Sequence, residues 1–259
     1  MHNAAFEAAD LNYVYVAFLV EDVASCLTGM RSMAGFRGMS VTIPHKRAVM
    51  PHLDDIEPMA RHVGSVNTIT NENGRLIGST TDGPGTLRAF REARVDPAGK
   101  RVLFLGSGGA VRAVAFAFAE LTKASAITIL GRTPSRVDEL VADLTAAGAS
   151  HVQGGPLAGE LERAMREHDI VIQGTSVGMK PDDGESIVPA HLLRGDQVVF
   201  DMVYRPHETR LIRDALRAGC TVIHGIEMLI HQAALQFERW TGVPAPIDAM
   251  RAAVARALS

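Results

Sequence analysis

Residues 101–121 read RVLFLGSGGAVRAVAFAFAEL. After Arg101 the segment opens with four apolar residues, which is typical of a short buried strand, and residues 111–121 are typical of a buried helix. The glycines between them allow the backbone to turn sharply and to approach a pyrophosphate, whose charge would lie at the positive end of the helix. This pattern predicts a Rossmann-type parallel sheet that binds a dinucleotide through Gly106, Ser107, Gly108, Gly109 and Ala110.

The end of the next predicted strand, residues 126–130, indicates which dinucleotide binds. An acidic residue there would hydrogen-bond the ribose 2′-hydroxyl of NAD, but the chain continues as Gly-Arg-Thr-Pro-Ser-Arg. Guanidinium groups suit the 2′-phosphate of NADP because they make charge-assisted, often bidentate bonds to it. We therefore predict that NADP is the cofactor and that Arg132, Thr133 and Arg136 bind it. The alternative is a solvated helix start with two exposed arginines.

Strands and helices alternate through the rest of this half of the chain. Further strands are predicted at 169–172, 197–201 and 221–223, and further helices at 135–147 and 208–218. Such alternation indicates parallel strands with right-handed crossovers and helices on both faces of the sheet.

The first 80 residues follow another pattern. They predict buried strands at 14–20 and 38–43, a helix at 54–62 and a hairpin at 66–80. The hairpin is indicated by Asn73-Gly74, because this pair supplies the positive φ values of a type I′ turn. This part of the chain is therefore expected to form a small α/β unit.

A chain of 259 residues is long for one compact core, so we expect an α/β protein of two domains. The NADP-binding Rossmann domain would comprise residues 84–225. The substrate-binding domain would be smaller, comprising residues 1–83 and 226–259, and would be closed by the C-terminal helices at 226–241 and 248–258.

The amino-acid composition limits the classes of binding partner that we expect for this protein. With 26 Lys+Arg against 29 Asp+Glu the net charge is -3, which does not favour nucleic acid and suits a small-molecule substrate. No apolar run is long enough to span a membrane and no signal peptide is evident, so we expect a cytoplasmic protein. Cys26 and Cys220 stand far apart and the histidines show no ligand spacing, so no metal is expected. The oligomeric state is open, a homodimer included.

Two residues are candidates for proton transfer. A nicotinamide enzyme that interconverts an alcohol and a carbonyl needs a group that carries the hydroxyl proton. Lys46 follows a predicted strand that stops at Pro44, and Asp82 follows the predicted hairpin. Each has an ordinary alternative, because loop lysines are usually solvated and an aspartate before a glycine is usually a turn or helix cap.

Several short motifs of the sequence occur in the order and spacing that are typical of one family. They are Val-Thr-Ile-Pro-His-Lys at 41–46, Val-Asn-Thr at 66–68, Thr-Asp-Gly-Pro-Gly at 81–85, Thr-Ser-Val-Gly-Met at 175–179, Asp-Met-Val-Tyr at 201–204 and Gly-Ile-Glu-Met-Leu-Ile-His-Gln-Ala-Ala at 225–234. Through these motifs and the glycine loop, the chain resembles the shikimate dehydrogenase family over essentially its whole length. The resemblance implies reversible NADP-dependent reduction of 3-dehydroshikimate to shikimate, a step of chorismate and aromatic amino-acid biosynthesis.

The resemblance also implies roles for individual residues. Lys46 would be the proton donor and acceptor, with Asp82 beside it. Contacts with substrate hydroxyls or carboxylate would come from Thr42, Lys46, Asn67, Asp82, Tyr204 and Gln232. The cofactor would be contacted, besides the glycine loop and the arginine group, by Thr175, Met202 and Gly225.

Departures from the family pattern leave the substrate open. Ser40 stands where asparagine is common and Thr80 replaces another asparagine, so a paralogue with preference for quinate or another substrate is an alternative. Family members usually carry a strand and a Ser-x-Ser-Pro segment just before Met-His-Asn, where this sequence starts. Because those serines bind the substrate carboxylate, we expect weak substrate binding, and a catalytically weakened NADP-binding protein is a second alternative.

A hydrolase is the rival from another class. Residues 174–178 match Gly-x-Ser-x-Gly and follow a predicted strand. A nucleophile elbow demands a helix directly after its serine, whereas residues 180–184, Lys-Pro-Asp-Asp-Gly, break any helix. The sequence therefore disfavours this reading.

Overall fold

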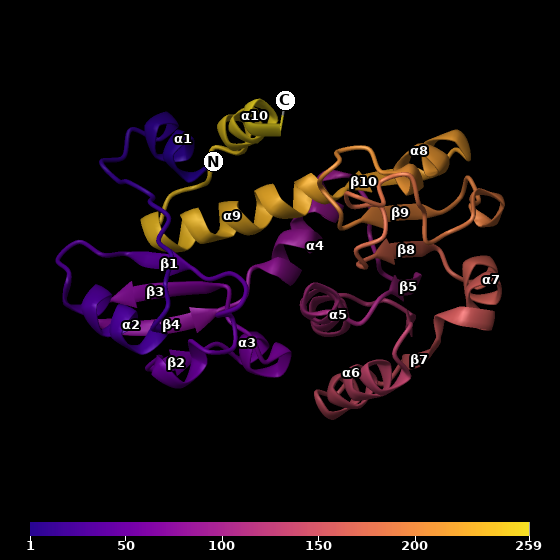
Figure 1. Ribbon diagram of the computed structural model, residues 1–259, viewed down its shortest axis with the longest axis horizontal. Helices are drawn as coiled ribbons and strands as arrows, with labels where there is room; N and C mark the ends of the chain where they lie inside the picture. The colour runs from indigo at the N-terminus through magenta and orange to yellow at the C-terminus, as the bar shows by residue number, and fades with distance from the viewer. Residues whose placement is uncertain (259) are drawn as a thin grey trace. The chain divides into compact units, whose positions relative to one another are not determined.

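The computed structural model describes residues 1–258 (Figure 1). The chain divides into two compact units, one formed by Met1–Gly85 with the chain from Ile230 onward, the other by Thr86–Leu229. We call them the first and the second unit. Within the described residues, no helix combines the length and the apolar character needed to cross a membrane.

The second unit contains a parallel six-stranded sheet in the order β10-β9-β8-β5-β6-β7. Its strands are β5 (Arg101–Leu105), β6 (Ala126–Gly131), β7 (Val152–Pro156), β8 (Ile170–Gln173), β9 (Val198–Asp201) and β10 (Thr221–His224). Counted along the chain, this is the Rossmann order 3-2-1-4-5-6 read from the other edge. The predicted fold class is confirmed. Strand β7 was missed, because its Gln-Gly-Gly-Pro sequence does not look like a strand.

Helices cover both faces of this sheet. The second unit's helices are α4 (Asp82–Glu92, from Thr86 onward), α5 (Gly109–Leu121), α6 (Pro134–Ala146), α7 (Leu157–Glu167), α8 (Arg210–Arg217) and the short η2 (Ala190–Leu192). Leu103 packs in one cluster with Met165 of α7 and Leu211 of α8. Phe104 points to the opposite face, because side chains alternate along a strand, and meets Phe118 of α5 edge-on. Burial on both faces explains the continuous apolar sequence of β5.

The first unit is built on a four-stranded sheet in the order β1-β3-β4-β2. Its elements are α1 (His2–Ala8), α2 (Val23–Ser32), β1 (Gly38–Ser40), η1 (Met50–His52), β2 (Asp55–Ile56), α3 (Pro58–Val63), β3 (Thr68–Glu72), β4 (Arg75–Ser79), α9 (Gly225–Thr241, from Ile230 onward) and α10 (Ile247–Leu258). Strands β3 and β4 are antiparallel, and Asn73 and Gly74 between them have φ values of 53° and 89°. The predicted hairpin and its turn are confirmed.

Two local predictions for the first unit were wrong. Residues 14–20 form no strand; Val14 is 74% exposed and Leu19 94%. The continuous apolar run is present, but the backbone of Tyr15 bonds the Asn3 side chain instead of a neighbouring strand. The helix predicted at 54–62 begins only at Pro58, because proline suits the first helical turn while the residue before it stays extended.

Helix α9 is fixed against its neighbours by close contacts that need glycine. A Cβ on Gly85 of α4 would lie 2.6 Å from the backbone nitrogen of Gln232, so the two helices touch there without a side chain between them. Further along α9, the Trp240 indole N–H donates to the carbonyl of Ile69 in β3 at 3.0 Å. These contacts set the position of the α9 side chains that face the sheet.

We expect Gly85→Ala to destabilise the first unit by about 1 to 3 kcal/mol, because the added methyl group would overlap backbone atoms that cannot move away. Gly29→Ala in α2 is the matched control, since nothing lies within 4 Å of its Cβ position. That substitution should be neutral or stabilise the helix by up to about 1 kcal/mol. Denaturant unfolding measures both, and equal stabilities of the two variants would contradict the close contact.

Asp201 at the end of β9 is a fully buried carboxylate. It accepts the N–H of Val203 at 3.0 Å and the hydroxyl of Thr209, which begins α8. Burial raises the pKa of Asp201 to about 6, although both hydrogen bonds act in the opposite direction. The folded protein therefore binds a proton here more readily than the unfolded chain does.

This difference predicts that acidification stabilises the second unit through Asp201. As pH falls from about 7 to about 4, the native carboxyl takes up a proton that the unfolded chain binds only near its ordinary pKa of 3.8. At 1.36 kcal/mol per pKa unit, and because the unfolded carboxyl is itself partly protonated at pH 4, the gain should be about 2 kcal/mol. We expect Asp201→Asn to lack this increment, measured as the difference between wild-type and variant unfolding free energies across that pH range. A constant difference would show that Asp201 does not titrate there.

Candidate functional site

The structure brings Lys46 and Asp82 together. The Lys46 ammonium lies 2.6 Å from Asp82 Oδ2, and the two side chains are 29% and 12% exposed. Lys46 is held in place because its carbonyl accepts the N–H of Val66 at 2.8 Å. Asp82 is the first residue of α4, where the helix dipole favours a negative charge. The pair is an anchored ammonium beside a fixed carboxylate, partly open to solvent.

The Asn67 side chain fixes the second oxygen of this carboxylate. Its amide nitrogen donates to Asp82 Oδ1 at 2.8 Å, and its carbonyl oxygen accepts the backbone N–H of Thr81 at 2.9 Å. Asn67 is only 3% exposed. Because the amide and the ammonium bind different oxygens, the plane of the carboxylate is defined.

The remaining residues predicted to contact the substrate are Gln232, Thr42 and Tyr204. Gln232 lies on α9, where its Oε1 is 3.5 Å from the Thr81 hydroxyl. Thr42 is exposed in the segment after β1. Tyr204 belongs to the second unit, in the segment after β9, and is 44% exposed. The first unit thus contains Thr42, Lys46, Asn67, Asp82 and Gln232, but not Tyr204.

Sequence reasoning missed the residues that surround Asn67. Thr68 and Thr81 belong to the family motifs, but the sequence predicted no role for them. Gln236 lies outside every motif. All three are buried and hydrogen-bond one another or Asn67. The available signal was the position of Gln236 four residues after Gln232, which places both on one face of a helix.

The glycine loop of the second unit has the expected form. Gly106 follows β5 with φ +114°, and a Cβ there would lie 3.1 Å from Thr175 Cγ2 after β8. Strands β5 and β8 are neighbours at the point where the strand order reverses, which is where open α/β sheets bind ligands. Nothing lies within 4 Å of the Cβ positions of Gly108 and Gly109. The loop therefore offers open backbone at the N-terminus of α5.

The other cofactor candidates lie after neighbouring strands of the same sheet. A Cβ on Gly174 would lie 2.9 Å from Met202 Sδ, and one on Gly225 would lie 2.6 Å from the carbonyl oxygen of Asp201. Thr175, Met202 and Gly225 thus share the carboxyl edge of β8, β9 and β10. Gln173, another residue that the sequence analysis left without a role, shapes this edge because its buried amide donates to the carbonyls of Thr175 and Val177.

The arginine group lies at the carboxyl end of β6. Arg132, Thr133 and Arg136 are exposed there, and Thr133 is the N-cap residue of α6. Among residues 1–258, no carboxylate pairs with Arg132 or Arg136, whereas Arg112 nearby in sequence binds Asp143 at 2.6 Å. Their charges are available to an anionic ligand.

The structure contains no nucleophile elbow at Ser176. Residues 174–189 form bends and turns, and no helix begins before Ala190. The geometry that a serine hydrolase of this type requires is therefore not present in this segment.

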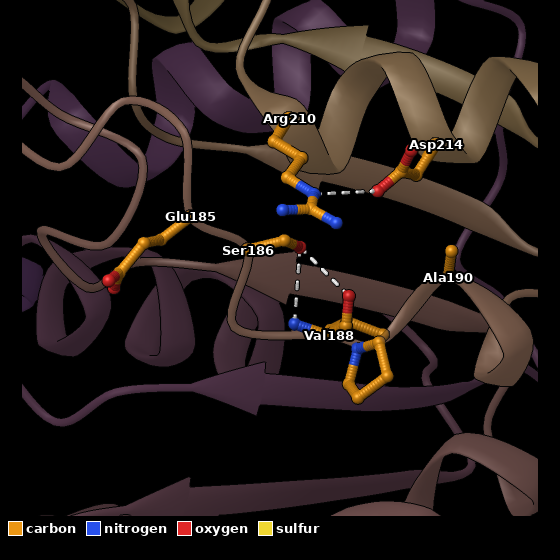
Figure 2. Close-up of a pocket in the computed structure, with 7 residues that line it drawn as sticks. Glu185, Ser186, Val188, Ala190, Arg210 and Asp214 are labelled. Carbon is orange, nitrogen blue, oxygen red and sulfur yellow. Dashed lines mark hydrogen bonds and ion pairs between the residues drawn. The ribbon is translucent and has the colours of Figure 1, made fainter.

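A surface cavity of about 260 Å³ lies elsewhere in the second unit (Figure 2). It is lined by Glu185, Ser186, Val188, Pro189, Ala190, Arg210 and Asp214. Three of its polar side chains have partners within the protein: Arg210 pairs with Asp214 and donates to the carbonyl of Gly184, and the Ser186 hydroxyl donates to the carbonyl of Val188. None of the predicted site residues lines it.

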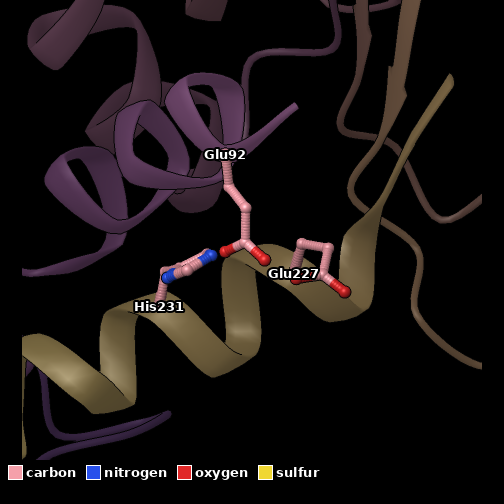
Figure 3. Close-up of side chains that lie close together, drawn as sticks. All are labelled: Glu92, Glu227 and His231. Carbon is pink, nitrogen blue, oxygen red and sulfur yellow. The ribbon is translucent and has the colours of Figure 1, made fainter. Parts of the chain in front are cut away.

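One group of residues of metal-binding types was not predicted from the sequence. Glu227 and His231 stand one turn apart on α9, and Figure 3 shows them with Glu92, which ends α4. The carboxylates of Glu92 and Glu227, both in the second unit, lie within 4.8 Å of each other. Carboxylate and imidazole are ligands that divalent metals accept, but exposed acidic groups commonly come together without one.

Family models match the chain in three segments. Residues 1–69 match the shikimate dehydrogenase substrate binding domain, residues 90–194 match shikimate / quinate 5-dehydrogenase, and residues 225–255 match the shikimate 5'-dehydrogenase C-terminal domain. The matches fall in the order that the motifs predict.

Whole-chain comparisons agree with these matches. The NADP(+) shikimate dehydrogenase of Moorella thermoacetica is 45% identical over 257 residues, covering 96% of this chain and 85% of the relative. A crystal structure of Listeria monocytogenes shikimate 5-dehydrogenase with shikimate and NAD has a TM-score of 0.92 at 35% identity, covering 98% of this chain and 90% of that one. A shikimate dehydrogenase crystallised with NADP+ has a TM-score of 0.90 at 39% identity, with coverage of 100% and 90%. The chain therefore belongs to the shikimate dehydrogenase family.

Proposed function

We propose that this protein is an NADP-dependent shikimate dehydrogenase that reversibly reduces 3-dehydroshikimate to shikimate, within the cytoplasmic synthesis of aromatic amino acids. The Lys46–Asp82 ion pair, with Asn67 on the other carboxylate oxygen, carries this proposal. In a chain with a Rossmann sheet, it supplies the proton-transfer group that oxidation of an alcohol requires. We assign the substrate contacts other than Tyr204 to the first unit and NADP binding to the second.

The proposed chemistry divides between cofactor and protein. NADPH, when bound, supplies the hydride that converts the substrate carbonyl to an alcohol. Lys46 gives its proton to the carbonyl oxygen in that direction and takes it back in the other. Asp82 holds the ammonium in one position through the 2.6 Å contact, so that the transfer starts from a defined geometry.

Recognition of a hydroxyl-rich acid needs several fixed polar partners. We assign these contacts to Thr42, Asn67, Asp82, Gln232 and Tyr204 along with Lys46. Support comes from the first unit, where Asn67 and Gln232 both bond the Thr81 hydroxyl and so belong to one hydrogen-bonded group.

For the cofactor, we assign the pyrophosphate to the open loop Gly106, Ser107, Gly108, Gly109 and Ala110, and the 2′-phosphate to Arg132, Thr133 and Arg136. Thr175, Met202 and Gly225 are assigned to the nicotinamide half. The two unpaired guanidinium groups at the end of β6 favour NADP over NAD, because NAD lacks the 2′-phosphate to which we assign them.

The proposal is tested by absorbance of the reduced cofactor, with shikimate and NADP supplied to the purified chain. Reduction of NADP by shikimate is expected. The same assay with quinate, with NAD and without substrate distinguishes the alternatives. Faster turnover of quinate would indicate a paralogue with that preference, and NADP binding without turnover would indicate a weakened enzyme. Sedimentation of the same sample tests whether it is a homodimer.

Replacement of the proposed proton carrier should affect turnover and not the cofactor. We expect Lys46→Met to lower kcat by roughly 10² to 10⁴ while the Kd of NADP stays unchanged, because the side chain belongs to the first unit. Lys100→Met, which removes an exposed lysine from the second unit, is the control. Turnover of Lys46→Met at the wild-type rate would sink the assignment.

Cofactor choice should depend on the two free arginines. The double variant Arg132→Ala/Arg136→Ala should bind NADP roughly 10- to 100-fold more weakly and NAD about equally well, allowing for screening of exposed charges. The control Arg166→Ala/Arg217→Ala removes two exposed arginines that are paired on the surface of the same unit. Titration of both cofactors measures the effect. Equal weakening of NADP and NAD would mean that the arginines act on the fold.

A further inference from the structure

The hydrogen-bonded group around Asn67 continues away from Asp82 to Gln236. Gln236 lies on α9 and is 2% exposed. Its amide nitrogen donates to the Thr68 hydroxyl at 2.9 Å and to the carbonyl of Asn67 at 3.2 Å, and its oxygen accepts the Ser40 hydroxyl at 2.8 Å. The amide thus uses both donors and one acceptor in the interior of the first unit.

From Gln236 to Asp82, each group of this series donates a hydrogen bond to the next one. The Thr68 hydroxyl has one proton, and because its oxygen accepts from Gln236, that proton is donated to Asn67 Oδ1 at 2.7 Å. The Asn67 oxygen is then occupied by Thr68 and by the Thr81 backbone N–H, so its nitrogen faces Asp82. The series ends at the carboxylate, which can only accept.

We infer that Gln236 is a positioning residue for the Lys46–Asp82 pair, acting through Thr68 and Asn67. The inference rests on the function proposed for that pair. A flipped Asn67 amide would set its oxygen against an oxygen of Asp82 and its nitrogen against the Thr81 N–H. Both contacts are repulsive, and the carboxylate would lose its second hydrogen bond.

Helix α9 holds Gln236 firmly enough for this role. The Gly85–Gln232 contact fixes the helix one turn before Gln236, and the Trp240–Ile69 hydrogen bond fixes it one turn after. Gln232 and Gln236 share a face of α9 because they are four residues apart. The face that carries a proposed substrate contact also carries the residue that orients Asn67.

The histidine beside Gln236 adds no charge to the series. Burial lowers the pKa of His2 to about 4, against the effect of its hydrogen bond with Gln236. Its imidazole is therefore neutral near pH 7. The charges at the end of the series are those of Asp82 and Lys46.

The test compares Gln236→Met, Thr68→Val and the double variant with the wild type. Each should lower kcat about 10-fold and leave the KM for NADP within about 2-fold, because the residues disturbed belong to the first unit and NADP binding is assigned to the second. The double variant should be no slower than the slower single one, since both changes interrupt one route. Thr68→Ser keeps the hydroxyl and should retain wild-type kcat.

The control is Thr128→Val in the second unit, which removes a buried hydroxyl that bonds His168 at 2.8 Å. It makes the same chemical change away from Asn67, so kcat should persist. Thermal unfolding of every variant checks the fold. Wild-type kcat in Gln236→Met, or additive losses in the double variant, would overturn the inference.

A second readout does not depend on turnover. The side-chain amide protons of Asn67, followed by NMR in ¹⁵N-labelled protein, should exchange with water faster in Gln236→Met than in the wild type. If the wild type does not oxidise shikimate, the proposed function fails while this exchange still decides the inference. Unchanged exchange in Gln236→Met would overturn it.

Discussion

The buried side-chain amide of Asn67 must have all its hydrogen bonds inside the protein, and this requirement organises the first unit. The register of the β3–β4 hairpin supplies them, because pairing of Thr68 with Ser79 brings Thr81 and Asp82 beside Asn67. A slip of one residue would move every side chain to the other face of the sheet. The two-residue turn that sets the register therefore also sets the geometry of the proposed catalytic pair.

In the second unit, glycines meet two different physical demands. A Cβ on Gly174 would collide with Val111 of α5 and with Met202, and one on Gly225 with the backbone after β9, so these glycines allow close packing. At Gly108 and Gly109 a Cβ would meet nothing, so internal packing does not require glycine there. The open positions are among those to which we assign the pyrophosphate, so they support that assignment more strongly than the packed ones do.

The sequence predicted best those elements whose structure depends on residues close together in the chain. Strand β5, the glycine loop and the hairpin turn were predicted because each depends on its own residues. The segment 14–20 was predicted wrongly, since an apolar run suits a buried strand but does not show whether a partner strand lies beside it. The spacing of Gln236 from Gln232 indicates a shared helix face, but its bond to Thr68 was not predictable, because it joins residues 168 positions apart and depends on where α9 packs.

The physical value of the buried series lies in orientation more than in stability. The Lys46–Asp82 ion pair is partly buried, with side chains 29% and 12% exposed, so the cost of removing its charges from water offsets much of their attraction. A buried amide without partners costs about 1 to 3 kcal/mol, so Asn67 admits few arrangements once its neighbours are in place. The neutral amides therefore define the geometry that the charged pair needs for proton transfer but cannot hold by its own attraction.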